Sequence, residues 1–175
     1  MRDSKDLKFS IIDDSGILAV ADAETYNPFV SENWTYIGLK RHFKMAMAAK
    51  SLLVWECGDG GDEYRVVVRN HFSDAKGFRE ITGAIEAKSA RLHLVSYTAL
   101  TMAAQFADEP IPNDMEADLA FEVDAGTLGI RIVQMFDPTS LERPLDHEPH
   151  FILEWQSGSA PIWTSIGWET DSDHK

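Results

Sequence analysis

Short runs of alternating apolar and polar residues occupy most of the chain, and turn residues separate them. Such runs predict β-strands, and two runs joined by a short turn predict a hairpin. The clearest turn is Asp13-Asp14-Ser15-Gly16, which lies between two apolar runs. The hairpins expected on this pattern join 9–12 with 17–20, 52–56 with 64–69, 83–86 with 91–95, 118–123 with 129–135, and 151–155 with 162–168.

One sequence pattern occurs twice in the chain. Trp55-Glu56 is followed 10 residues after the aromatic residue by Arg65, and Phe121-Glu122 is followed at the same distance by Arg131. Earlier positions also match, namely Ile11, Ser15, Leu18 and Val20 with Ile85, Ser89, Leu92 and Leu94. We therefore expect a single mainly β (α+β) domain, in which duplicated antiparallel units form a sandwich or a barrel-like sheet. Its parts would be two related halves, 9–70 and 83–136, and a C-terminal aromatic hairpin, 150–168.

Helix signals are fewer. Residues 97–106 have apolar residues at near-helical spacing, with Ser96 or Thr98 as a possible N-cap. Residues 40–50 fit a helix or a strand equally well, and the preceding stretch, 34–39, is rich in strand-forming residues. The polar stretch 70–82 is expected to be a linker.

Composition limits the function classes. The formal net charge of −13 disfavours nucleic acid and anionic membranes as partners, because both need a concentrated basic surface. It permits solubility alone, or attraction to a basic protein. No apolar run reaches the ~20 residues of a membrane helix, the first residues do not resemble a signal peptide, and the single Cys57 has no disulfide partner, so we expect a cytoplasmic protein.

Two groups of residues invite a metal hypothesis. Asp146, His147 and His150 are dense in ligand-type side chains, but Pro149 prevents the helical spacing that would align the two imidazoles. In the glycine-rich turn, Asp59, Asp62 and Glu63 offer oxygen ligands without the spacing of a known calcium loop. We favour solvated acidic loops at both places and expect no metal or cofactor.

The repeated Glu56, Arg65, Glu122 and Arg131 have two interpretations. Each pair could neutralise its charges across neighbouring strands, or both pairs could face a shared pocket. The aromatic residues Trp34, Tyr36, Trp155, Trp163 and Trp168 could be core residues or a ligand or partner surface. Cys57 corresponds to Val123 in the repeat, which favours a buried hydrophobic role, and no catalytic motif is present.

The Ser-Gly-Ile-Leu-Ala-Val strand at 15–20, the Trp-Glu-Cys-Gly-Asp-Gly-Gly turn at 55–61 and the Tyr-Arg-Val-Val-Val strand at 64–68 resemble small acidic bacterial proteins similar to immunity proteins. The net charge, the absence of catalytic motifs and the duplicated β scaffold favour a non-enzymatic, immunity-like protein that binds a basic partner such as a toxin domain. Two alternatives stay open. One is a small-molecule-binding protein with a pocket between the halves, and the other is a metal-dependent hydrolase that uses His147 and His150.

Overall fold

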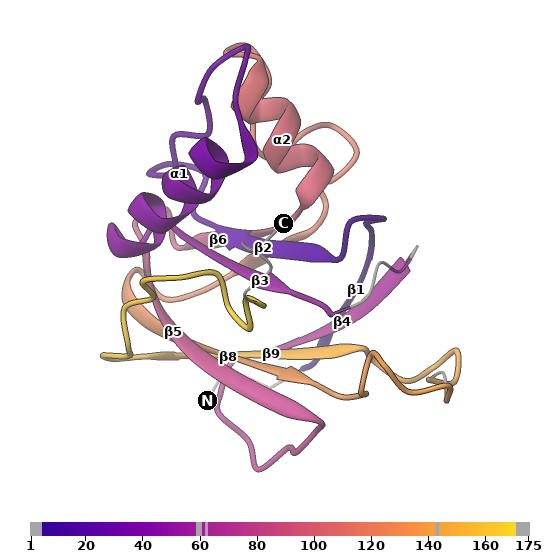
Figure 1. The fold of residues 1–175 in the computed structure, drawn as a ribbon. Coiled ribbons are helices and arrows are strands. Elements are labelled where there is room, and N and C mark those ends of the chain that lie inside the picture. Colours follow the sequence, from indigo (N-terminus) through magenta and orange to yellow (C-terminus); the bar gives the residue numbers. More distant parts are fainter. Residues whose placement is uncertain (1–4, 59–60, 62, 143, 171–175) are drawn as a thin grey trace.

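The computed structural model describes residues 5–58, 61, 63–142 and 144–170 (Figure 1). The elements of this part of the chain are, in order, β1 (Leu7–Ile12), β2 (Ile17–Ala21), α1 (Tyr36–Ala48), β3 (Leu52–Glu56), β4 (Glu63–Arg69), β5 (Arg79–Ala87), β6 (Arg91–Ser96), α2 (Tyr97–Gln105), β7 (Ala120–Glu122), β8 (Gly126–Gln134) and β9 (Phe151–Ser157).

Two sheets pack face to face and the helices form a third layer (Figure 1). One sheet has five strands in the order β1-β4-β9-β8-β5, and the other has four in the order β3-β2-β6-β7. Between the sheets, the ring of Trp55 meets the edge of Phe151 at 6.0 Å between centroids. Both helices cover the outer face of the four-stranded sheet, so β2 is buried on both faces. The expected α+β, mainly β sandwich is confirmed.

The first four expected hairpins are wrong, although their strands exist. β1 and β2 follow each other in sequence but belong to different sheets, and the same holds for β3 with β4, β5 with β6, and β7 with β8. At the first of these corners, the buried carboxylate of Asp13 accepts hydrogen bonds from the backbone N–H groups of Gly16, Ile17 and Tyr97. The bonds turn the chain from one sheet into the other, and Gly16 adopts a φ of 73° to allow it.

Each half of the chain places its elements in the same way. The order is strand, strand, helix, strand, strand, with the outer strands in the five-stranded sheet and the inner strands in the four-stranded sheet. The pair Ile17↔Glu56 between β2 and β3 has its counterpart in Arg91↔Glu122 between β6 and β7. β9 lies between the halves, parallel to β4 and antiparallel to β8. That the two halves superpose stays a prediction.

Most of residues 40–50, which fitted a helix or a strand equally well, belongs to helix α1. α1 begins where strand-forming residues were expected, because the hydroxyl of Thr35 caps it by accepting from the N–H of Gly38. The helix buries Leu39, Phe43 and Met47, which are spaced four residues apart on one face. α2 follows the expected bounds closely, and the Ser96 hydroxyl is its N-cap.

The expected C-terminal aromatic hairpin does not form. β9 is its first strand, but residues 158–168 cross from the five-stranded sheet to the four-stranded sheet (yellow segment in Figure 1). The carbonyl of Pro161 accepts from Ala84 of β5, and Gly167 exchanges backbone hydrogen bonds with Val54 and Glu56 around β3. The segment therefore seals the side of the sandwich formed by the edge strands β3 and β5, which we call the closed edge. The opposite side, formed by β1 and β7, is called the open edge.

Candidate functional site

The repeated Glu and Arg residues do not pair with one another. Glu56 and Glu122 lie in the four-stranded sheet, whereas Arg65 and Arg131 lie on strands of the five-stranded sheet. Glu56 accepts hydrogen bonds from Thr170. The Arg65 guanidinium donates to the backbone carbonyls of Leu145 and Glu148. The predicted ladder pairs are therefore wrong, and the four side chains do not line one pocket.

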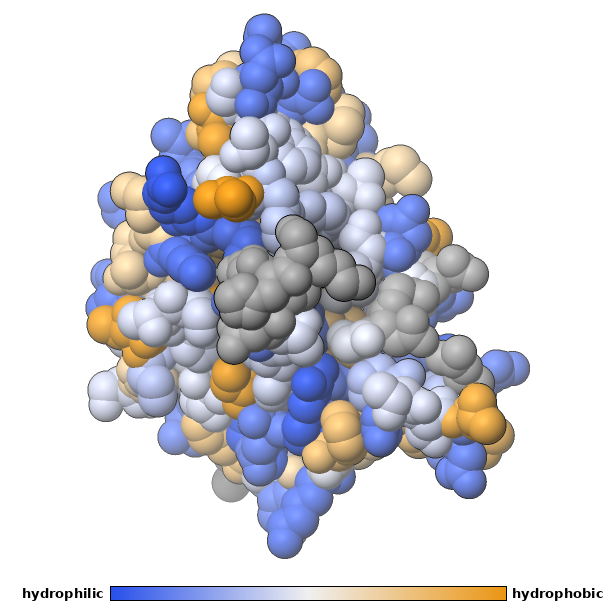
Figure 2. All heavy atoms as spheres, in the orientation of Figure 1, coloured by the Kyte–Doolittle hydropathy of each residue, from blue (hydrophilic) through white to orange (hydrophobic). Residues whose placement is uncertain are grey.

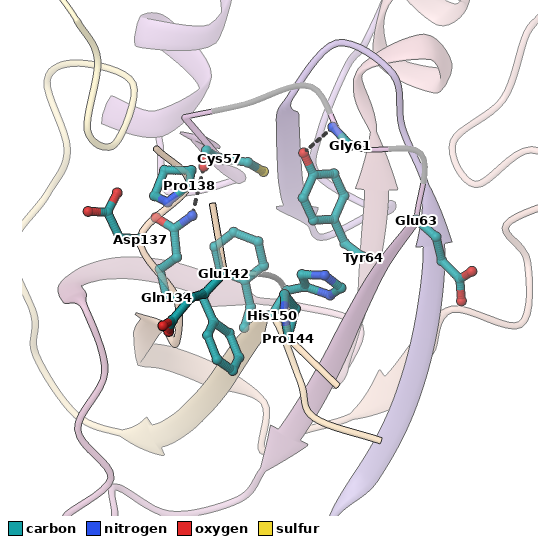
Figure 3. Close-up of a pocket in the computed structure, with 12 residues that line it drawn as sticks. Cys57, Gly61, Glu63, Tyr64, Gln134, Asp137, Pro138, Glu142, Pro144 and His150 are labelled. Atoms are coloured by element: carbon teal, nitrogen blue, oxygen red, sulfur yellow. Dashed lines mark hydrogen bonds between the residues drawn. The ribbon is translucent and has the colours of Figure 1, made fainter. Parts of the chain in front are cut away.

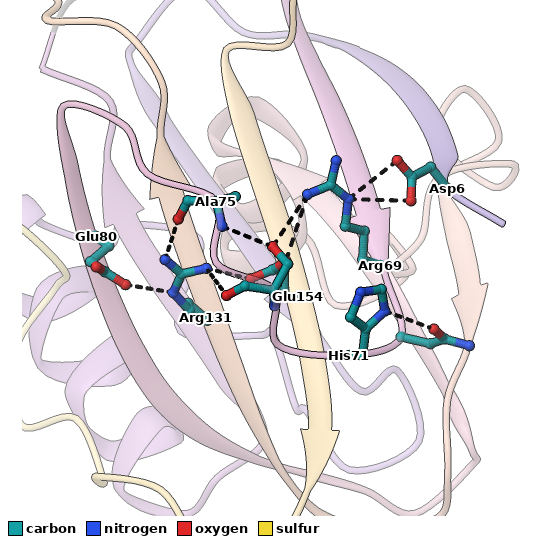
Figure 4. Close-up of polar contacts among 9 residues, drawn as sticks. Asp6, Arg69, His71, Ala75, Glu80, Arg131 and Glu154 are labelled. Atoms are coloured by element: carbon teal, nitrogen blue, oxygen red, sulfur yellow. Dashed lines mark hydrogen bonds and ion pairs between the residues drawn. The ribbon is translucent and has the colours of Figure 1, made fainter. Parts of the chain in front are cut away.

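Arg131 belongs to a different network, on the outer face of the five-stranded sheet (Figure 4). It pairs with the exposed Glu80 and with Glu154, which is fully buried and also meets Arg69. Arg69 in turn pairs with Asp6, so that acids and arginines alternate across the strands. The hydrogen bond that Arg131 donates to Glu80, and then the one to Glu154, raise the pKa of Arg131, although burial of the guanidinium acts in the opposite direction. Sequence spacing could not reveal this row, because it depends on β9 lying between β4 and β8.

The row also fixes the segment that was expected to be a linker. The N–H of Ser73 donates to Glu154, and Arg131 donates to the carbonyls of Ser73 and Ala75. Residues 70–78 are thereby tied across the outer face, and β5 begins at Arg79 rather than after residue 82. We assign this network a structural role.

The metal candidates do not converge. The His150 ring accepts a hydrogen bond from the N–H of Arg65 through Nδ1, and burial followed by the Arg65 charge lowers its pKa. Asp146 and His147 are exposed, and among the residues that the structure describes no three His, Cys, Asp or Glu side chains form a metal-binding group. Asp59 and Asp62 lie outside the described residues, whereas Glu63 accepts from the hydroxyl of Ser10.

A small cavity of about 90 Å³ lies beside the glycine-rich turn (Figure 3). Tyr64, His150 and Phe151 line it, and the Tyr64 hydroxyl accepts from the N–H of Gly61. Cys57 is buried here, and burial raises the pKa of its thiol, as suits a hydrophobic residue rather than a nucleophile. Small-molecule pockets usually enclose about 300–1,000 Å³, so the cavity is too small for that role.

The aromatic candidates are separated rather than gathered on one surface. Trp163 is almost buried at the closed edge, where its indole N–H donates to the carbonyl of Thr82. Trp155, also almost buried, lies on β9 beside a groove at the open edge. Trp55 and Phe121 point into the core, and their neighbours Glu56 and Glu122 are more exposed, as strand alternation requires.

The open edge brings β1 against β7. The rings of Phe9 and Phe121 lie 6.4 Å apart between centroids and join the two sheets there. Next to this contact is a groove of about 710 Å³, bounded by Leu7 of β1 and by Glu122 and Val123 at the end of β7. On the face of the molecule drawn in Figure 2, hydrophobic residues appear as separate spots among hydrophilic ones.

The two halves differ in the number of their cationic residues. From residue 92 to residue 130 the sequence has seven acidic residues and no lysine or arginine. Residues 18–64, the corresponding part of the first half, also have seven acidic residues, but they have four lysine or arginine residues as well. Asp114, Asp118 and Glu122 are exposed before and at the end of β7. Glu116 differs, because its carboxylate is bound to Ser96 at the start of α2. Of the acidic residues of the second half, Asp118, just before β7, and Glu122, at its end, therefore border the open edge.

Comparisons with known proteins agree with this architecture. No protein-family model and no curated protein matches the chain. A solved structure described as Crocagin biosynthetic gene J matches with a TM-score of 0.57 and 14% identity, over 88% of this chain and 97% of that one. ComJ from Bacillus subtilis, described as an inhibitor of the DNA-degrading activity of NucA, matches with a TM-score of 0.50 and 10% identity, over 87% of this chain and 96% of that one. At these identities the likeness shows the fold alone.

One further property bears on the environment of the protein. In the part of the chain that the structure describes, neither helix has the length and apolar character needed to cross a membrane.

Proposed function

We propose that this chain is a non-enzymatic binding protein whose acidic open edge binds a basic protein. The observation that carries the proposal is the cation-free stretch 92–130, whose exposed Asp114, Asp118 and Glu122 flank edge strand β7. Acids gathered on one side attract a basic surface from a distance and orient it, because their fields add rather than cancel. The cationic α1 side would face away from such a partner.

The first candidate partner is a DNA-degrading enzyme. The fold is shared with ComJ, which is described as an inhibitor of such an activity. Enzymes that act on DNA present lysine and arginine to the phosphate backbone, so an acidic edge is complementary to the surface that they use for substrate. Binding there would exclude DNA without any catalytic group on this chain.

Two charge variants test the proposal. In the edge variant, Asp114, Asp118 and Glu122 are replaced by lysine, and in the control variant Glu32, Asp74 and Glu86 are replaced by lysine. All six side chains are exposed, and the two variants have the same net charge. Wild-type chain and control should capture the same basic protein from a lysate of the source cell at low salt and release it at high salt.

The edge variant should fail to capture that protein. If a DNA-degrading activity is present in the captured fraction, adding wild-type chain should lower it, whereas adding the edge variant should not. Equal capture by the edge variant and the control, or capture that added salt leaves unchanged, would contradict the proposed binding surface.

A further inference from the structure

The two edges of the sandwich differ in their backbone partners. At the closed edge, β3 and β5 form hydrogen bonds with residues 161–167 of the same chain, for example from Ala84 N–H to the Pro161 carbonyl. At the open edge, within the part of the chain that the structure describes, the strand pairing of β1 is with β4 alone and that of β7 is with β6 alone. Among the described residues, the chain thus supplies a partner for the closed edge and none for the open edge.

The side chains of β1 show what the open edge lacks. Leu7, Phe9 and Ile11 alternate toward the second sheet, and their exposure falls from 41% at Leu7 to 1% at Ile11. At the closed edge, the indole of Trp163 fills the space between β5 and β3. At the open edge, Phe9 already fills the equivalent space by contact with Phe121. The missing component is therefore a backbone partner for β1, together with apolar cover for Leu7.

We propose that an extended segment of the partner adds to β1 as a sixth strand of the five-stranded sheet. The inference rests on the proposed function, because the partner is the basic protein described above. Strand addition takes its affinity from backbone hydrogen bonds and its specificity from alternate side chains. The six residues of β1 suffice for such a ladder, whereas β7, with three, is too short.

The surroundings of β1 define the chemistry of the segment. One face of an added strand would continue the face of β1 that carries Leu7 and Phe9, on the side where Val123 follows β7, so it requires apolar side chains. Asp118 and Glu122 favour lysine or arginine next to them. Cations in the groove do not reverse this preference. Arg69 pairs with Asp6 and Glu154, and Arg91 lies opposite Glu122 in the strand ladder. Lys5 is the remaining cationic residue that lines the groove.

Synthetic peptides test strand addition without an identified partner. The first alternates lysine and valine, and the second has the same charge and length but a proline in place of the central valine. The alternating peptide should bind the full chain, and hydrogen exchange should slow by about tenfold or more at alternate amides of β1. Amides of Ala84 and Glu86 at the closed edge, which already have backbone acceptors, should exchange at an unchanged rate. The proline peptide should bind more weakly and leave β1 unprotected, because proline cannot donate to a ladder.

Several outcomes would overturn the inference. Equal binding of the two peptides would show attraction by charge alone, and absence of binding would show that β1 does not accept a strand. A concentration-dependent dimer with protected β1 amides would identify a second copy of this chain as the occupant. None of these results decides the capture experiment on the charge variants, so the proposed function can stand or fall separately. Protection of β1 by the alternating peptide supports strand addition even if no basic protein is captured.

Discussion

Gly83 of β5 lies directly beneath the indole of Trp163, where a Cβ atom would come within 2.4 Å of Nε1. The same nitrogen donates a 2.9 Å hydrogen bond to the carbonyl of the preceding residue, Thr82. The side chain of Leu53 in β3 would also contact that Cβ atom, at 2.9 Å. The closed edge therefore depends on a glycine at the one point of β5 where the C-terminal segment crosses it.

Replacing Gly83 with Ala should displace Trp163 and destabilise the fold by about 1–3 kcal/mol, the usual cost of overpacking. Urea denaturation measures the loss. When Trp163 is already Ala, the added methyl group has space, so the cost of Gly83→Ala should shrink in the double variant. Additive costs would mean that the two residues do not contact each other as described.

Trp55→Ala should cost about 3–5 kcal/mol, because the ring is fully buried between the sheets and its removal leaves a cavity. Ile37→Ala on the exposed face of α1 is the control and should change stability by about 0.5 kcal/mol or less. A loss below about 1 kcal/mol for Trp55→Ala in chemical denaturation would place the ring at the surface.

Glu154→Gln should destabilise by about 3 kcal/mol, because it removes the buried charge that faces Arg69 and Arg131. Glu80→Gln removes a carboxylate from the same Arg131, but this side chain is 54% exposed, so the expected loss is about 1 kcal/mol or less. Urea denaturation of the two variants compares their losses of stability. Each variant loses one negative charge, so a difference between the losses reports the effect of burial. Equal losses would contradict the buried role of Glu154.

His150 should make stability depend on pH below its ordinary pKa of 6.5. Burial lowers the pKa in the folded chain, so the unfolded chain binds the proton more tightly. The stability contributed by neutral His150 is then complete above pH 6.5 and declines as the pH falls below it. His150→Asn keeps an acceptor for the Arg65 N–H and cannot titrate. The difference in unfolding free energy between wild type and variant should narrow from about pH 8 to about pH 5. A constant difference would exclude His150 as the cause.

The sequence allowed the strands to be located but not paired. Alternation near Phe9 and Phe121 reflects one buried face per strand, and the continuous apolar run that ends at Trp55 reflects a strand buried on both faces; both patterns are local properties. A hairpin and a corner between two sheets have the same alternation, and the difference lies in bonds such as those of Asp13 to Ile17 and Tyr97. For the same reason Glu56 and Arg65 were expected to be neighbours, although their strands belong to separate sheets.

Of the candidate site, only the acidic character could be predicted from the sequence. The excess of acidic residues was visible in the sequence, but the placement of Asp118 and Glu122 beside an unpaired edge required the order of the strands. Glu116 could not be separated from its neighbours, because its bond to Ser96 joins segments that are distant in sequence. The partner role of residues 158–168 was hidden as well, since an aromatic run with turn residues fits a hairpin equally well.

Sealing one side of the sandwich sets a limit on how far association can proceed. A sheet with two unpaired edge strands can pair edge to edge with copies of itself indefinitely, as in fibres. Here residues 158–168 cover part of β5, so that, among the described residues, one strand added to β1 would occupy the remaining free edge of the five-stranded sheet. We therefore expect a complex built through that sheet to be a discrete particle rather than a polymer.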